Sequence, residues 1–199
     1  MPSPNAPTVR LRRSQERGFE DFGWTDNWMT FSFADYHDPD WVHFGPLRVM
    51  VENHIQPHEG FSSHPHRDAE IVTYVSSGTL THGDNQGHEA AISAGEMQLI
   101  SAGSEGMVHS EENHHSVVEH NYQMWLVPYT ADEAGADGPM PVNTDAYIYA
   151  GLFDAGDRTS HSLREGRGAW VQVVEGEVEV AGVTLQRGDG AGITDTEAL

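Results

Sequence analysis

Glycines divide this sequence into short runs of apolar and β-branched residues, and this punctuation limits the chain to few folds. Gly78, Gly95, Gly176 and Gly188 are examples of the glycines that separate such runs. No long segment has the periodicity of a helix. Short runs bounded by turn residues are typical of an all-β sandwich or barrel. We expect strands at residues 47–51, 70–75, 79–82, 97–100, 122–127, 169–174 and 178–180.

The same local pattern occurs twice along the chain. Residues 74–80 followed by 95–97 read as strand, tight turn, strand and turn, and residues 173–178 followed by 188–190 repeat that order. Between the copies, residues 131–141 are poor in large apolar side chains and end in Gly and Pro, as in a linker. The sequence therefore predicts two β-barrel domains, at residues 1–130 and 142–199, joined by a linker at 131–141.

The second copy is shorter than the first. It has no counterpart of the run at 122–127, so the C-terminal barrel is expected to be incomplete. Either the sequence is truncated or this domain is degenerate. In both cases a sheet edge would be left unpaired unless another chain or segment covers it.

The charge of the chain limits its partners. The 199 residues include 31 acidic and 10 basic ones, all of the latter arginine, for a formal charge of −21. Like charges repel, so direct binding to nucleic acid or to an anionic membrane is not expected. Acid-rich, lysine-free composition also resembles proteins of high-salt organisms. Four arginines lie near the N-terminus, where we expect a solvated arm: Arg10, Arg12, Arg13 and Arg17.

Cysteine is absent, which excludes disulfides and thiolate ligands. The first 18 residues lack the apolar run of a signal peptide, and no stretch is long and apolar enough to cross a membrane. A cytoplasmic protein is therefore expected.

Two short motifs, or phrases, contain the candidate metal ligands: His64-Pro65-His66 and His109-Ser110-Glu111. Residues at i and i+2 of a strand point to the same face, so each phrase can direct two ligands to one point. Three imidazoles and a carboxylate suit a divalent transition metal such as Fe, Mn, Co, Ni, Cu or Zn. Glu70 competes with Glu111 for the fourth position, because it lies four residues after His66 and shares its strand parity.

Seven other histidines carry less information. They lie near expected turns or in a polar region after the second phrase, and we expect surface positions for His54, His58, His82, His88, His114, His115 and His120. Several large apolar residues are candidates for either barrel core or the wall of an aromatic-binding pocket: Phe44, Met50, Phe61, Met107 and Trp125.

In its motifs the chain resembles the pirin family of bicupins. The resemblance rests on HFGPLRV at 43–49, HPHR at 64–67 with Glu70 and Thr73-Tyr74, SAG at 101–103, and HSE at 109–111. It continues more weakly through QMW at 123–125, and WVQV at 170–173 is similar to the C-terminal cupin of bacterial members. The implied fold is all-β, with two antiparallel jelly-roll barrels and the metal in the N-terminal one.

The resemblance also implies a site and a reaction. Its ligands would be His64, His66, His109 and Glu111, with Glu70 orienting a ligand from behind, and its metal would be Fe(II). Bacterial pirins resemble quercetin 2,3-dioxygenases, which implies a flavonol substrate, O2 as co-substrate, and Glu111 as a catalytic base. The alternative is a non-enzymatic, iron-dependent redox sensor that acts through a protein partner, as animal pirins do.

Overall fold

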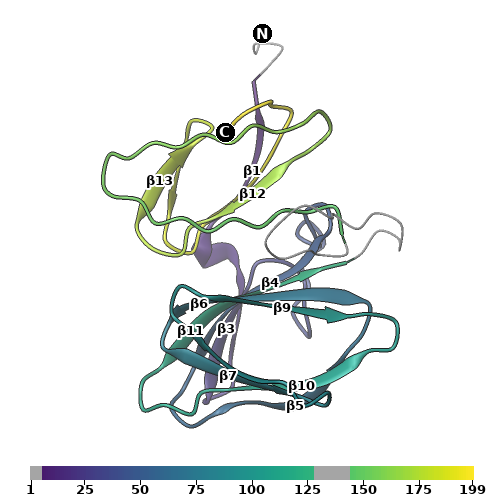
Figure 1. Ribbon diagram of the computed structural model, residues 1–199. Coiled ribbons are helices and arrows are strands. Elements are labelled where there is room, and N and C mark those ends of the chain that lie inside the picture. Colours follow the sequence, from purple (N-terminus) through teal and green to yellow (C-terminus); the bar gives the residue numbers. More distant parts are fainter. Residues whose placement is uncertain (1–5, 128–143) are drawn as a thin grey trace. The chain divides into compact units, whose positions relative to one another are not determined.

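The computed structural model describes residues 6–127 and 144–199 of the chain (Figure 1). The described residues form antiparallel β-sheets, and the helix among them is one short 3-10 turn, η1 (Ser14–Glu16). The predicted all-β class is confirmed. No helix in the described part of the chain is long and apolar enough to cross a membrane.

The chain divides into two compact units. The N-terminal unit is Gly18–Tyr147, and the C-terminal unit combines Ile148–Leu199 with the segment that ends at Arg17. The linker predicted at 131–141 lies outside the described residues. The domain boundaries at 130 and 142 stay predictions.

Two antiparallel sheets face each other in the N-terminal unit (Figure 1). The six-stranded sheet has the order β2-β3-β4-β11-β6-β9. Its strands are β2 (Gly18–Asp21), β3 (Thr25–Met29), β4 (Leu47–Ile55), β6 (Ala69–Ser77), β9 (Met97–Ala102) and β11 (Glu119–Leu126). The four-stranded sheet has the order β5-β10-β7-β8. Its strands are β5 (Gly60–His66), β7 (Thr79–Asp84), β8 (Glu89–Ser93) and β10 (Met107–Glu112).

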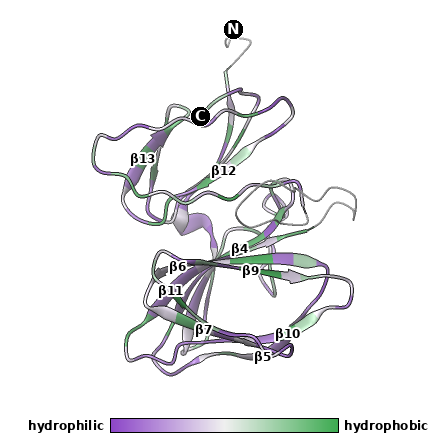
Figure 2. Ribbon diagram, in the orientation of Figure 1, coloured by the Kyte–Doolittle hydropathy of each residue, from purple (hydrophilic) through white to green (hydrophobic). Residues whose placement is uncertain are grey.

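The core of this unit lies between the two sheets. Ile71 of β6 packs with Met107 of β10, and Val75 of β6 packs with Leu80 of β7, so β6 turns its odd-numbered residues inward. Alternating strand residues point to opposite faces, which leaves the even-numbered residues of β6 on the outer face of the six-stranded sheet. Figure 2 shows hydrophobic stretches on both sheets, for example on β9 and β7.

The C-terminal unit has a three-stranded sheet of order β1-β15-β12 and a hairpin of β13 with β14. The bounds are β1 (Thr8–Arg12), β12 (Ala169–Gln172), β13 (Glu177–Val180), β14 (Val183–Gln186) and β15 (Gly190–Thr194). Its core is Val173, Leu185, Ala191 and Ile193.

The N-terminal segment is a strand of this unit, so the expected solvated arm is wrong. β1 pairs with β15 along its whole length, from Thr8 opposite Thr194 to Arg12 opposite Gly190. Arg12 is 3% exposed, and Arg13 forms an ion pair with Asp189 at 2.6 Å. The sheet edge that the sequence left open is thus covered by the chain's own first strand.

Candidate metal centre

The two histidine-bearing phrases lie on neighbouring strands, as the sequence predicted. β5 carries His64 and His66, β10 carries His109 and Glu111, and the two strands pair antiparallel. His109 lies directly opposite His64, and Met107 lies opposite His66. This register places the three imidazoles on the inner face of the four-stranded sheet.

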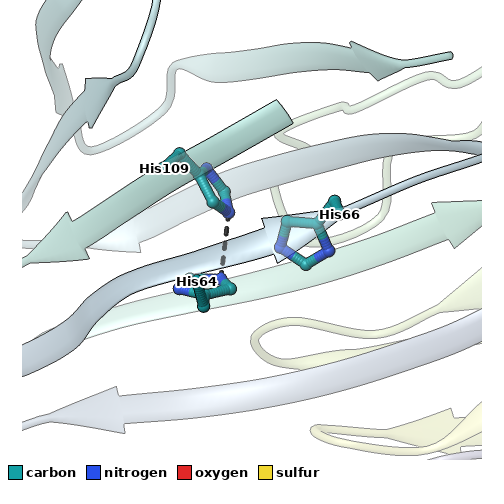
Figure 3. Close-up of side chains that lie close together, drawn as sticks. All are labelled: His64, His66 and His109. Carbon is teal, nitrogen blue, oxygen red and sulfur yellow. Dashed lines mark hydrogen bonds between the residues drawn. The ribbon is translucent and has the colours of Figure 1, made fainter. Parts of the chain in front are cut away.

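The imidazoles converge on one point (Figure 3). One nitrogen of each of His64, His66 and His109 lies within 4.8 Å of the others. The Nε2 atoms of His64 and His109 are 3.0 Å apart, and the His66 ring centroid is 4.7 Å from each of the other two. Three donors at such separations can share one cation.

The protonation of these rings suits a metal. Burial, and then the neighbouring imidazoles, lower the pKa of His66 to about 4 and that of His109 to about 3. Both rings are therefore neutral at pH 7. The Nδ1 of His64 is 2.7 Å from the carbonyl oxygen of Ser62, to which it donates, so Nε2 is the nitrogen left to bind a metal. The Nε2 of His66 is buried without a hydrogen-bond partner among the described residues, as expected of a nitrogen that binds a metal ion.

Glu111 follows His109 on β10 and lies next to it. Its Oε2 lies 3.9 Å from the Nε2 of His109. Between His109 and Glu111 the pairing with β5 slips by one residue, so that Glu111 faces Phe61 rather than Ser62. Such a bulge redirects side chains locally.

Three residues of the facing sheet hold the Glu111 carboxylate. Gln98, Thr73 and Gln123 lie side by side on β9, β6 and β11, in one row across the strands. Gln123 donates to Oε2 at 2.6 Å, Thr73 donates to Oε1 at 3.2 Å, and the Gln98 amide is 3.5 Å from Oε1. Burial raises the pKa of Glu111, and the Gln123 hydrogen bond opposes that rise.

Glu70 does not share the face of the histidines. Asp68 has a φ of +54°, and the chain leaves β5 at His66 and enters β6 at Ala69, so the strand parity counted from His66 is lost. Glu70 lies one residue from the inward-facing Ile71, on the outer face of the six-stranded sheet. There its carboxylate accepts a hydrogen bond from Ser101 at 2.7 Å. The expectation that Glu70 orients a ligand from behind is therefore wrong.

A fourth histidine lies behind the site, where the sequence predicted a surface position. His82 is only 5% exposed, faces Glu111 across the β7–β10 pairing, and has its Nδ1 3.4 Å from the Nδ1 of His109. Its Nε2 lies 3.7 Å from Asp84. A partner on Nδ1 fixes which nitrogen of His109 is free to bind a metal. The alternation of β7, read from Leu80 in the core, would have shown that His82 points inward.

The remaining histidines divide into two groups. The expected surface positions are confirmed for His58, His88, His114 and His115. They are wrong for His54 and His120, which lie within β4 and β11 and are half-buried and buried.

A hollow with aromatic walls opens beside His64. It has a volume of about 340 Å³ and is lined by Trp24, Glu59, Gly60, Phe61, Ser62 and His64. The Trp24 and Phe61 rings meet edge to face at 4.8 Å. Of the other pocket candidates, Met50 and Met107 are buried, whereas the half-buried Trp125 packs its ring 4.8 Å from that of His66.

Two family models match this chain. The pirin model matches residues 9–126, and the model described as "Quercetinase C-terminal cupin domain" matches residues 130–199. The chain belongs to the pirin family. The predicted bicupin fold is thereby confirmed, with a pirin cupin followed by a second cupin.

Several relatives align with nearly the whole length of the chain. It is 36% identical to a quercetin 2,3-dioxygenase of Escherichia coli K12, over 96% of this chain and 92% of the relative. It is also 36% identical to a pirin-like protein of Caulobacter vibrioides, over 92% and 89% of the two chains. The crystal structure of the bacterial pirin YhhW of Escherichia coli in complex with nickel(II) is similar, with a TM-score of 0.80 and 34% identity. That match covers 96% of this chain and 92% of YhhW.

Proposed function

We propose that this chain is a metal-dependent dioxygenase that opens the central ring of flavonols such as quercetin. The observation that carries the proposal is the convergence of three imidazoles, with Glu111 next to one of them, beside a hollow lined by Trp24 and Phe61. The Escherichia coli relative that is named quercetin 2,3-dioxygenase, matched over 92% of its length, supports the choice of reaction.

His64, His66, His109 and Glu111 would hold one divalent metal, which supplies a Lewis acid and a redox-active centre when bound. The family resemblance favours Fe(II), and the nickel complex of YhhW shows that a related pirin takes nickel(II). These donors are compatible with several first-row metals. Metal analysis of the protein from its own source identifies the ion, and iron at one per chain is the expected result.

Different residues around the metal ligands would bind the substrate, accept its proton and hold the accepting carboxylate in position. The hollow at Trp24 and Phe61 is large enough for flat aromatic rings and leads to His64. Glu111 accepts the proton of the flavonol 3-hydroxyl, because burial raises its pKa towards the range of a base that works at neutral pH. Gln123 and Thr73 hold the carboxylate in place while the proton arrives. The flavonolate and O2 then give the ring-opened ester and carbon monoxide.

The test is aerobic turnover by the iron-loaded protein. Quercetin absorbance should fall with release of one carbon monoxide per flavonol. His109→Gln should abolish turnover, whereas the matched variant His115→Gln, at an exposed position, should not change it. If the protein turns over no flavonol with any loaded metal, the proposed dioxygenase activity is wrong. The alternative, an iron-dependent regulator with a protein partner, is then favoured.

The composition supports a setting for this activity. We infer a cytoplasmic protein of a high-salt organism without direct binding to nucleic acid or membranes. The excess of 31 acidic over 10 basic residues supports the high-salt setting and the lack of binding to these anionic partners. High salt should screen the repulsion between these charges. The melting temperature should therefore rise with KCl, and a protein that is equally stable at low salt would contradict the inference.

A further inference from the structure

We propose that the outer face of the six-stranded sheet carries a second site for a divalent first-row cation, made by Glu52, His54 and His120. One ligand atom of each of these residues lies within 4.8 Å of the other two. The proposal is independent of the dioxygenase activity, because these side chains point away from the first metal centre.

The strand pattern separates the two sites. On β4, Val49, Val51 and Ile55 pack in the core between the sheets, so Glu52 and His54 project from the opposite face. On β11, Gln123 reaches inward to Glu111, so His120 also projects outward.

The second cluster is built in the same way as the first. In the first, His109 lies opposite His64, and His66 follows two residues along the strand. In the second, His120 lies opposite His54, and Glu52 precedes His54 by two residues. A cross-strand pair plus an i, i+2 neighbour brings three donors to one side of a sheet.

The distances suit a shared cation. The Oε1 atom of Glu52 is 2.9 Å from the Nε2 of His120 and 3.6 Å from the Nε2 of His54. The two imidazole rings meet edge to face with centroids 4.3 Å apart. Glu52 also takes part in other interactions, which its remaining lone pairs can serve. Two imidazoles and one carboxylate are a common donor set for Zn²⁺ and similar ions.

Ser76 indicates which nitrogen of His120 is available. The Ser76 Oγ lies 3.1 Å from the carbonyl oxygen of His120, to which it donates. The same Oγ atom lies 2.7 Å from the Nδ1 of His120. With the hydroxyl proton on the carbonyl oxygen, Nδ1 donates to the hydroxyl oxygen, and Nε2 is the nitrogen left to bind a metal. This Nε2 lies 2.9 Å from a carboxylate oxygen of Glu52, a contact that either a bound cation or a shared proton accounts for.

His54 supplies the reason to prefer a metal over a proton. A proton shared by His120 and Glu52 would satisfy that pair alone. The Nε2 of His54 is buried and has no hydrogen-bond partner within the described residues, although it points to the same carboxylate. A metal ion would satisfy all three groups. The His54 side chain is 25% exposed, which gives an ion a way in.

The experiment is a Zn²⁺ titration of the metal-free full-length chain by calorimetry, with bound metal counted after gel filtration. The wild type should bind two ions per chain. His54→Gln should lose one and keep the other, and His64→Gln should show the reverse pattern. The matched control His58→Gln, in which an exposed histidine near the end of the same strand is changed, should still bind two.

The residual ion in each variant shows that the variant has folded. In the His64→Gln background, Zn²⁺ should also raise the melting temperature, and adding His54→Gln should remove that rise. One ion per wild-type chain, or two in His54→Gln, would overturn the proposal. So would ¹⁵N NMR spectra showing a doubly protonated His120 that Zn²⁺ does not change, because the shared proton would then explain the contact.

Discussion

Replacing Gln123 by Met should weaken metal binding through Glu111 without touching a metal ligand. The Gln123 amide donates to the Glu111 carboxylate at 2.6 Å inside the sandwich, where Glu111 is only 2% exposed. A hydrogen bond to a charged group contributes ~1.5–3 kcal/mol. One pKa unit corresponds to ~1.4 kcal/mol, so the loss should raise the pKa of Glu111 further by about one to two units. At a pH where both carboxylates are protonated, a metal must displace that proton, and the metal affinity of the variant should be about 10- to 100-fold lower.

The pH dependence identifies the cause. Burial already raises the pKa of Glu111, so metal affinity should increase with pH as the carboxylate loses its proton. In Gln123→Met this increase should be shifted to higher pH, and the difference from the wild type should shrink once both carboxylates are ionised. Competition with a chromophoric chelator between pH 6 and pH 9, at roughly one-unit steps, measures both curves.

Gln98→Met is the matched control. Gln98 and Gln123 flank Thr73 in the same row, but the Gln98 amide is 3.5 Å from the carboxylate, too far for a strong hydrogen bond. Its removal should change metal affinity less than about threefold.

Gln123→Met should also lower the melting temperature, because the Trp125 indole N–H loses the Gln123 oxygen to which it donates at 2.8 Å. Equal affinity losses in the two variants, or none in Gln123→Met, would refute the role assigned to this hydrogen bond.

Three other changes test the structure around the site. His82→Leu removes the partner of His109 Nδ1, and metal affinity by chelator competition should fall about 10- to 100-fold, with no change in the exposed His88→Gln. Burial raises the pKa of Glu119 from 4.5 to about 8, so its contribution to stability is full at low pH, falls as the pH rises between these two values, and is gone above pH ~8; Glu119→Gln should remove this fall, measured by urea unfolding at pH 6 and 9. Asn113→Ala deletes side-chain donations to three backbone carbonyls and should cost ~2–3 kcal/mol in the same assay, a result that a loss below ~0.5 kcal/mol would contradict.

Local rules were enough to predict seven of the strands and the histidines of the metal centre. The i, i+2 spacing of His64 with His66, and of His109 with Glu111, depends only on strand alternation within one element. The turn glycines delimit the same elements, since Gly78 lies between β6 and β7 with a φ of +79°. Each run predicted as a strand overlaps an observed strand.

Contacts that join distant parts of the chain could not be predicted in this way. The pairing of β1 with β15 joins residues near opposite ends of the chain, and no local pattern marks Thr8–Arg12 as the missing edge strand. The burial of His54 and His120 was not predicted for a related reason. A histidine on the outer face of a strand looks like a surface residue until the strand opposite it is known.

The position of Glu70 shows how a correct rule fails when it is carried across a strand end. Alternation holds only while the chain stays in one strand, and Asp68, with its φ of +54°, ends β5 before β6 begins. The parity count from His66 placed Glu70 on the inner face with the histidines, whereas the side chain lies on the outer face of the other sheet. Glu111 shares an unbroken strand with His109, and it stays on the same face even though the bulge lies in the pairing with β5. A ligand assignment from spacing is thus secure within a strand and needs the fold as soon as the count passes a turn.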